Sequence, residues 1–440
     1  MKKPRSLARV LLLLLAVGAQ GFAQSRWIVR VHSSGTNSLT QLAPSAGWAS
    51  VYAPQGVYAV TVWANVAQTL QALKTSPLVQ SVEPDVAVTL PETDAGYNPG
   101  GHTVPALVTS GSFNIPSPLI APWGAYLNQP ANTIVKLPQA QKAFGYGGGL
   151  VAIIDTGIDF QHPILFPVVN FWQGMDFTGT NDITGNSDLT QETSPVVDQE
   201  TSPVVDGGGT IILNQETSPV VDQETSPVVD SRMPPDFGHG TMVAGIVHLV
   251  APRARILPIK AFNSNGTGNL SSVIAAIYYA AQQGATVINM SFGGPQNSAA
   301  LQAAINYAQS QGATCVAAVA NSNAPAVQYP AGDSNVIGVA STNNQDQKSS
   351  FSSWGSDADL AAPGEAIVTT FPFNRYALGW GTSFATPYVS GTVALLQSIK
   401  PNTNILNDLN KGADPVYGLA PGQTLGTGRL DVYQSGEAVH

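Results

Sequence analysis

Residues 285–320 read ATVINMSFGGPQNSAALQAAINYAQSQGATCVAAVA, and this stretch decides the fold. Short apolar runs at 285–290 and 313–320 lie on either side of a helical pattern at 298–311. Apolar runs without polar alternation are typical of strands that are buried on both faces of a parallel sheet. The stretch therefore predicts a strand, a crossover helix and a second strand parallel to the first.

The same alternation continues outward along the chain. Further apolar runs occupy 150–154, 255–261 and 335–340, and another helical pattern covers 270–283. We therefore predict a three-layer α/β domain over residues 122–440, with a mainly parallel sheet between two layers of helices. In such sheets, functional side chains gather beyond the carboxyl ends of the strands.

The N-terminus has the pattern of an export signal. Four basic residues precede the apolar run 10–18, and small residues follow it. Residues 1–23 are therefore predicted to be a signal peptide that is cleaved after Ala23, which implies a secreted protein, either extracellular or periplasmic. The alternative, a stable membrane anchor, is disfavoured because the apolar run is too short to span a bilayer.

Residues 24–90 predict a small α+β unit ahead of the large domain. Strand patterns lie at 26–31, 57–63 and 79–88, and a helical pattern lies at 67–74. Residues 91–121 are rich in Pro, Gly, Ser and Thr without a clear period, so they are predicted to be a linker.

Composition indicates a folded globular protein whose net charge comes mainly from one block. Hydrophobic residues make up 43% of the 440 residues and charged residues 10%. Four copies of QETSPVVD carry eight of the nine net negative charges, so the rest is nearly neutral and no basic surface for nucleic acid is expected. We interpret this block, residues 191–230, as a polar loop inserted into the large domain, with a specific binding role as the alternative.

Three short segments each place a reactive side chain beside glycine near an apolar run. Asp155 follows the run 150–154 in D-T-G, His239 stands in G-H-G-T at the start of a helix, and Ser383 stands in G-T-S-F-A-T-P where another helix begins. A carboxylate can orient a histidine, and the unpaired N–H groups of a helix N-terminus can hold an oxyanion. Each residue alone also fits a purely structural role, as a turn carboxylate, a core histidine or an N-cap serine.

The order of the three segments favours the catalytic interpretation. Asp, His and Ser follow one another as in subtilisin, and not as in chymotrypsin or the α/β-hydrolases. The serine motif also differs from G-x-S-x-G, which counts against a lipase or esterase. With D-T-G, H-G-T and G-T-S-x-A-T-P, the chain resembles the subtilisin-like (S8) serine peptidases over residues 123–440.

The resemblance implies hydrolysis of peptide bonds through an acyl-enzyme. Ser383 would be the nucleophile, His239 the general base and Asp155 the residue that orients the imidazole. Asn321 and the backbone N–H of Ser383 would bind the oxyanion. No cofactor is required, and a monomer that acts on proteins or peptides is expected.

The resemblance also implies how substrate and leader bind. Ser291, Phe292 and Gly293 match the segment that pairs with the substrate backbone. Residues 24–90 resemble the family's inhibitory propeptide, so we expect a zymogen in which this propeptide binds the peptidase domain.

Matching the family's specificity segments places four apolar residues around the pocket for the fourth substrate residue before the cut. Leu270 and Val273 are three apart on one predicted helix face, so they can line one surface. Phe292 and Leu301 come from the segments that follow. The alternative is that all four are ordinary core residues.

Several segments depart from the family pattern. The usual G-N-x-G is Ala320-Asn321-Ser322-Asn323, which leaves the conformation of the oxyanion loop open, and Met242 replaces the second histidine of H-G-T-H. The loop that holds a tight calcium ion in many subtilisins is missing before 250–253, so no metal site is assigned. The stretch 181–188 could bind calcium weakly, although a solvated loop is favoured.

The sequence also allows an alternative function. A non-catalytic secreted binding protein on a degraded peptidase scaffold is the alternative function, although every residue of the predicted site is present. The single cysteine, Cys315, excludes an intrachain disulfide, and its small apolar neighbours predict a core position rather than a nucleophile.

Overall fold

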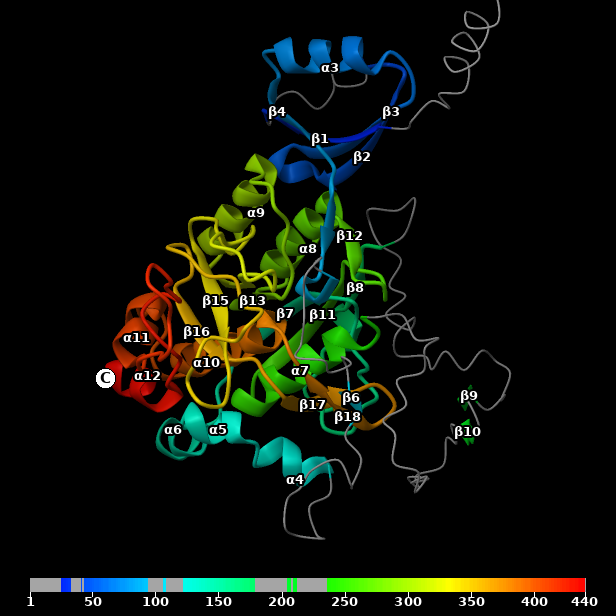
Figure 1. Cartoon of the computed structure of the whole chain (residues 1–440). Coiled ribbons are helices and arrows are strands. Elements are labelled where there is room, and N and C mark those ends of the chain that lie inside the picture. The colour runs from blue at the N-terminus through cyan, green and yellow to red at the C-terminus, as the bar shows by residue number, and fades with distance from the viewer. Residues whose placement is uncertain are drawn as a thin grey trace, which may run out of the picture. The chain divides into compact units, whose positions relative to one another are not determined.

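The structure, a computed structural model, describes residues 25–32, 41, 43–93, 106–107, 122–178, 204–206, 209–211 and 236–439 (Figure 1). The chain forms two compact units, residues 1–85 and 86–440, and each is described by itself. The predicted signal peptide and the stretch 181–188 lie outside the described residues. The domain boundaries at 23, 90 and 121 stay predictions.

The first unit is a four-stranded antiparallel sheet with one helix. Its elements are β1 Ser25–Val31, β2 Ala46–Tyr52, β3 Val57–Val62, α3 Val66–Thr75 and β4 Val79–Pro84, and the strand order is β2-β3-β1-β4. Valines of β1 and β3 pack with Leu73 of α3 in a small core. Strand β2 was not predicted, because within it only Val51 is buried and the alternation is weak.

The predicted strand at 79–88 is wrong as a single element. Strand β4 ends at Pro84, whose nitrogen has no hydrogen to donate to a ladder. The chain continues as β5 Ala87–Thr89, which belongs to the second unit.

A seven-stranded parallel sheet forms the centre of the second unit. The strand order is β16-β15-β14-β13-β7-β11-β8. The bounds are β7 Leu150–Asp155, β8 Met175–Asp176, β11 Arg255–Lys260, β13 Val287–Met290, β14 Thr314–Ala318, β15 Val336–Thr342 and β16 Leu360–Pro363. The residues of β13 and β15 are buried throughout, which explains their continuous apolar sequence. The predicted α/β fold is confirmed.

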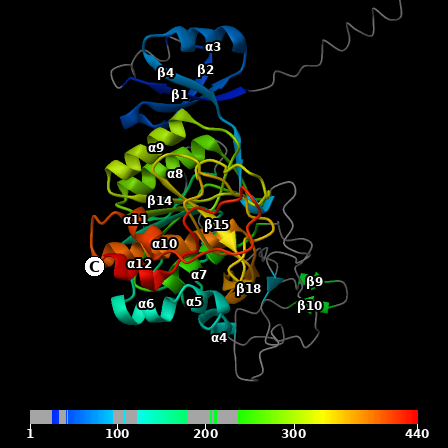
Figure 2. The same ribbon diagram turned by 60° about the vertical axis from the view of Figure 1, so that its left-hand side comes forward.

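Four long helices cover the sheet in two pairs. Helix α7 His239–Val250 packs on α10 Thr382–Ile399, and α8 Leu270–Gln282 packs on α9 Ala299–Ser310. Figures 1 and 2 show the two pairs on opposite faces of the sheet. Small residues allow the close approach of α7 and α10: a Cβ at Gly391 would lie 2.6 Å from the Cβ of Val250.

Shorter elements complete the chain. The helices are α4 Pro122–Leu127, α5 Pro130–Ile134, α6 Leu137–Phe144, α11 Ile405–Gly412 and α12 Val432–Val439, with single 3-10 turns at η2 Ala53–Gln55, η3 Pro91–Thr93 and η4 Phe171–Gln173. Strand β12 Thr267–Asn269 pairs with β5, and β9 Val204–Asp206 pairs with β10 Gly209–Ile211. Strand β18 Arg375–Gly379 pairs with β17 Ile367–Phe371 on one side and with β6 Ala106–Leu107 on the other. Within the described part of the chain, no helix has the length and apolar character needed to cross a membrane.

Candidate active site

Asp155 and His239 meet where strand β7 ends and helix α7 begins. Asp155 is the last residue of β7 and is fully buried, and its Oδ1 accepts a hydrogen bond from Thr156 N at 2.7 Å. The same oxygen lies 2.8 Å from Nδ1 of His239, the first residue of α7. A proton on Nδ1 therefore donates to the carboxylate and leaves Nε2 on the opposite side of the ring.

The glycines around His239 permit this approach. A Cβ at Gly240 would lie 2.1 Å from the carbonyl oxygen of Gly157 and 3.1 Å from Cβ of Asp155, so a side chain there would push α7 away from β7. Gly238 precedes the helix with φ +79°, in the left-handed region. Helix α7 and the end of β7 therefore lie so close together that glycine is required after His239, and the left-handed backbone before it also favours glycine.

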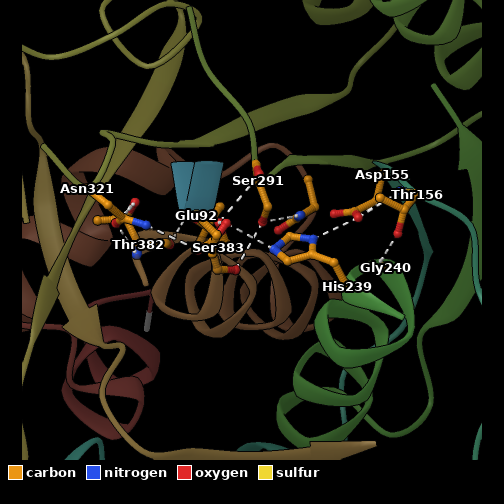
Figure 3. Close-up of polar contacts among 11 residues, drawn as sticks. Glu92, Asp155, Thr156, His239, Gly240, Ser291, Asn321, Thr382 and Ser383 are labelled. Atoms are coloured by element: carbon orange, nitrogen blue, oxygen red, sulfur yellow. Dashed lines mark hydrogen bonds and ion pairs between the residues drawn. The ribbon is translucent and has the colours of Figure 1, made fainter. Parts of the chain in front are cut away.

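Ser383 is the second residue of helix α10 and is fully buried. Its Oγ donates to Oε2 of Glu92 at 2.8 Å, and it also lies 3.5 Å from the carbonyl oxygen of Ser291. Oε2 of Glu92 is 3.3 Å from Nε2 of His239 as well. One carboxylate oxygen therefore contacts both the predicted nucleophile and the predicted base (Figure 3).

Asn321 is fixed by the first residue of the same helix. Its Oδ1 accepts from Thr382 N and from Thr382 Oγ1, both at 2.9 Å. Because the oxygen is used in this way, the amide nitrogen Nδ2 points toward the Glu92 carboxylate, with Nδ2 to Oε1 at 3.2 Å (Figure 3). An N–H donor at this place can bind an oxyanion on the substrate.

The predicted oxyanion loop keeps a glycine-like backbone although alanine and asparagine stand where the family pattern has glycine. Ala320 has φ +98° and Asn323 has φ +51°, both in the left-handed region that glycine adopts most easily. Asparagine tolerates this region, whereas alanine is strained there. Asn323 Oδ1 accepts from Nζ of Lys348 at 2.8 Å, so its side chain has another partner.

Burial and neighbouring carboxylates set the charges of the site. Burial opposes a charged imidazole at His239, but Asp155 and Glu92 outweigh it and raise its pKa well above the usual range. Asp236, three residues earlier, is 4% exposed, and burial raises its pKa to about 7, while His239 opposes that rise. The histidine thus has a strong preference for its protonated form in this arrangement.

The predicted substrate-pairing segment lies beside Ser383. The hydroxyl of Ser291 donates to the carbonyl oxygen of Ser383 at 3.0 Å. Gly293 exchanges two backbone hydrogen bonds with Thr89, at 3.0 and 3.3 Å. Residues 87–89 form strand β5, which pairs antiparallel with β12 on its other side. The protein's own chain therefore lies as an extended strand between Gly293 and β12.

The four residues predicted around a specificity pocket do lie together. Leu270, Val273, Phe292 and Leu301 line a cavity of about 150 Å³. Val86, Ala87 and Val88 line the same cavity from β5 and the residue before it. All four predicted residues are at most 5% exposed, so they belong to the core as well as to the pocket wall.

The sequence patterns did not predict every residue of the site. Glu92 fell in the predicted linker, and a single Glu after Pro91 carries no signal that relates it to Ser383. Strand β12 is a three-residue segment with two polar residues and a glycine, so it lacks the apolar run that marked the other strands. The roles of Glu92 and of strand β12 become visible only in the folded structure, where segments far apart in the sequence lie next to each other.

Fold and site together define a serine hydrolase with its reactive groups at the carboxyl edge of a parallel sheet. The chain belongs to the subtilase family, whose model matches residues 147–410, and it is by class a serine endopeptidase. The match begins just before β7 and ends within α11, so it includes all three predicted triad residues.

Named relatives support the same assignment. Thermitase from Thermoactinomyces vulgaris is 34% identical over 313 residues, which cover 68% of this chain and 93% of that protein. Subtilisin DY from Bacillus licheniformis is 36% identical over 44% of this chain and 76% of its own length. The thermophilic serine proteinase of Bacillus sp. (strain AK1) is 36% identical over 45% of this chain, and the match spans about half of that relative, 51%.

Proposed function

We propose that this protein is a secreted endopeptidase, made as a zymogen, that cleaves proteins with Asp155, His239 and Ser383. The observation that carries the proposal is the set of contacts that connects Asp155, His239 and Ser383. Asp155 holds Nδ1 of His239 at 2.8 Å, and one oxygen atom lies within 3.3 Å of both Nε2 of His239 and Oγ of Ser383. The scissile carbonyl of a substrate would bind beside Oγ of Ser383 with its oxygen toward Nδ2 of Asn321, where Oε1 of Glu92 lies in this structure.

The chemistry follows from these positions. Oγ of Ser383 attacks the carbonyl carbon while Nε2 of His239 takes its proton, and the histidine then returns that proton to the leaving amine. The buried carboxylate of Asp155 stabilises the imidazolium that forms in between. Water then hydrolyses the acyl-enzyme by the same route in reverse.

Asn321 Nδ2 and the backbone N–H of Ser383 would stabilise the tetrahedral oxyanion. The amide is held in the donor orientation because Thr382 occupies its oxygen. The helix N-terminus adds positive partial charge at the same place, since Ser383 is in the first turn of α10. These donors are oriented before the substrate arrives, which is the condition for efficient electrostatic catalysis.

Replacement of Ser383 by Ala tests the nucleophile. We expect Ser383→Ala to abolish peptide hydrolysis and self-cleavage, because the proposed nucleophile is removed. Ser310→Ala, which changes an exposed serine at the end of α9, is the matched control and should keep full activity. Hydrolysis by purified Ser383→Ala protein at the control rate would refute the assignment. The non-catalytic alternative would be favoured if the parent, after an added protease has removed its N-terminal residues, did not react with a fluorophosphonate probe.

Secretion is proposed from the N-terminal sequence. Expression in a bacterial host with an export pathway should yield protein outside the cytoplasm that begins at Gln24. The measurement is N-terminal sequencing of the exported Ser383→Ala protein, in which self-cleavage cannot trim the end further. Retention of Met1 in that protein would contradict the proposal.

A further inference from the structure

Residues 86–93 occupy the place where a substrate strand is expected. Strand β5 pairs with β12, and Thr89 exchanges both backbone hydrogen bonds with Gly293. Leu90 N donates to the carbonyl oxygen of Gly266, and Leu90 is fully buried. After this extended stretch the chain turns into η3, which begins at Pro91 and carries Glu92.

The Glu92 side chain lies in the catalytic centre. It is 6% exposed, and its two carboxylate oxygens are divided between the predicted catalytic groups. Oε2 accepts from Oγ of Ser383 at 2.8 Å and lies 3.3 Å from Nε2 of His239, and Oε1 accepts from Nδ2 of Asn321 at 3.2 Å. Figure 3 shows the carboxylate between Asn321 and His239.

The shape of the site accommodates this carboxylate closely. A Cβ at Gly381 would lie 2.0 Å from Oε1 of Glu92 and 3.1 Å from Nδ2 of Asn321. The absence of a side chain at Gly381 therefore leaves the space into which Oε1 fits. That space faces the amide donor proposed to bind the substrate oxyanion.

The contacts of Glu92 interrupt the catalytic relay in two ways. The hydroxyl of Ser383 donates to Oε2 of Glu92, and Nε2 of His239 faces the same oxygen at 3.3 Å. The negative carboxylate also holds the imidazole in its protonated form, which cannot accept the proton of the serine. The Ser383 hydroxyl is bonded to the Glu92 side chain and lies 3.5 Å from the Ser291 carbonyl oxygen, and it makes no hydrogen bond to a backbone carbonyl of residues 86–93.

We propose that Glu92 is a tethered carboxylate inhibitor, which occupies the oxyanion site and separates Ser383 from His239 until the segment leaves. The inference rests on the proposed function, because it assumes that Ser383 is the nucleophile. It goes beyond the resemblance of residues 24–90 to an inhibitory propeptide, since the residue that blocks the chemistry lies outside that range and acts through its side chain. The pocket contact of Val88 and the strand pairing of β5 hold the carboxylate in place.

The test measures the reactivity of Ser383 in the intact chain. The parent, Glu92→Gln and Glu92→Asp are purified in the cold and treated with a fluorescent fluorophosphonate probe, and the label is read only in the full-length band of a gel. Glutamine has the same shape without the charge, and aspartate keeps the charge but is one methylene too short to reach all three groups. Both variants should label about tenfold faster or more, which corresponds to the loss of one charge-assisted hydrogen bond.

A matched control removes a carboxylate elsewhere. Glu437→Gln changes a glutamate on α12 whose carboxylate accepts a hydrogen bond from Tyr433, and its full-length band should label at the parental rate. Equal labelling of the parent and both Glu92 variants would overturn the inference while leaving the serine mechanism intact. Faster labelling of Glu437→Gln would also overturn it, since the effect would then come from net charge.

The labelling results distinguish failure of the serine mechanism from failure of the Glu92 inhibition. If no band of any variant reacts, including shortened protein from which an added protease has removed the N-terminal residues, then the proposed function is wrong and this inference is wrong with it. If one Glu92 variant fails to fold, as judged by circular dichroism, the other decides the outcome by the same labelling rate.

Discussion

At the scale of single residues, the site depends on groups that orient other groups. Asn321 is useful as a donor only because Thr382 uses its oxygen twice, and His239 presents Nε2 only because Asp155 holds Nδ1. Ala320 keeps a left-handed backbone where the family has glycine, so the orientation of Asn321 is preserved at the expense of local strain. The left-handed backbone at this position is therefore retained although the residue type has changed.

Replacing Asn321 by Ala should lower kcat by about 10²–10³ and leave KM almost unchanged, because its bond to the oxyanion forms mainly in the transition state. That magnitude is the one known for the oxyanion asparagine of subtilisin, and it is adopted for this chain by analogy. Steady-state kinetics on a peptide substrate measure it, with Asn306→Ala, a change at an exposed asparagine of helix α9, as the matched control. A loss of less than tenfold would show that Asn321 is not the donor.

At the scale of elements, the predicted specificity pocket lies where α8, α9 and the end of β13 converge. Leu270 and Val273 come from α8, Leu301 from α9, and Phe292 follows β13, and together they line one apolar cavity. Val88 of β5 lines it from the opposite side and is itself 6% exposed. A substrate strand with the register of β5 would place its own side chain there.

We therefore predict a preference for Phe, Leu or Ile at the fourth substrate residue before the scissile bond. Each buried methylene contributes at most about 0.8 kcal/mol, and a charged side chain would lose its hydration there. A positional-scanning peptide library measures the preference. Leu270→Ala should shift it toward the largest side chains, whereas Leu406→Ala on α11 should not. A flat profile, or a preference for Lys or Glu, would reject the pocket assignment.

At the scale of the whole second unit, burial gives stability a pH dependence. His162 is 1% exposed, its Nε2 lies 3.1 Å from the carbonyl oxygen of Arg375, and Nδ1 has no partner within the described residues. Burial lowers its pKa to about 4, an effect that nearby His248 reinforces and the Arg375 contact opposes. The ring also packs edge-on against Tyr376, which leaves no room for hydration of a charged form.

Because the folded pKa of His162 is below its unfolded value, the unfolded chain binds more protons between about pH 6.5 and 4. The free energy of unfolding should therefore fall as the pH is lowered through this window, by about 3 kcal/mol at most from this residue. Urea denaturation of Ser383→Ala and of Ser383→Ala with His162→Leu, at several pH values, measures the difference. The second protein should be less stable at pH 7 but should lose less stability on acidification.

Two buried carboxyl groups act in the opposite direction. Burial raises the pKa of Asp236 and of Asp333 to about 7, so the folded state binds their protons over part of the same range. Since both groups are present in both proteins, their contribution cancels in the comparison. His32→Leu, a change at an exposed histidine, is the control and should follow the parent. Identical pH profiles for all three proteins would contradict the prediction.

The sequence by itself determined the parallel α/β frame and the three segments that carry Asp155, His239 and Ser383. Strands that are buried in a parallel sheet require continuous apolar runs. A histidine or serine at the start of a helix that packs closely against another element requires neighbouring glycines. Both constraints act on residues that are adjacent in the sequence, so the sequence shows them directly. The same holds for Cys315, which is buried in β14 as its small neighbours predicted.

Only the tertiary structure decided what fills the site. Glu92 lies in a segment without periodicity, and β12 has no apolar run, so neither carries a local signal. Their roles come from pairings between residues far apart in the chain: Thr89 with Gly293, Val88 with Gly268, and the Glu92 carboxylate with Ser383 and Asn321. Backbone hydrogen bonds and a carboxylate contact impose almost no restriction on neighbouring residue types, which is why the sequence could not reveal them.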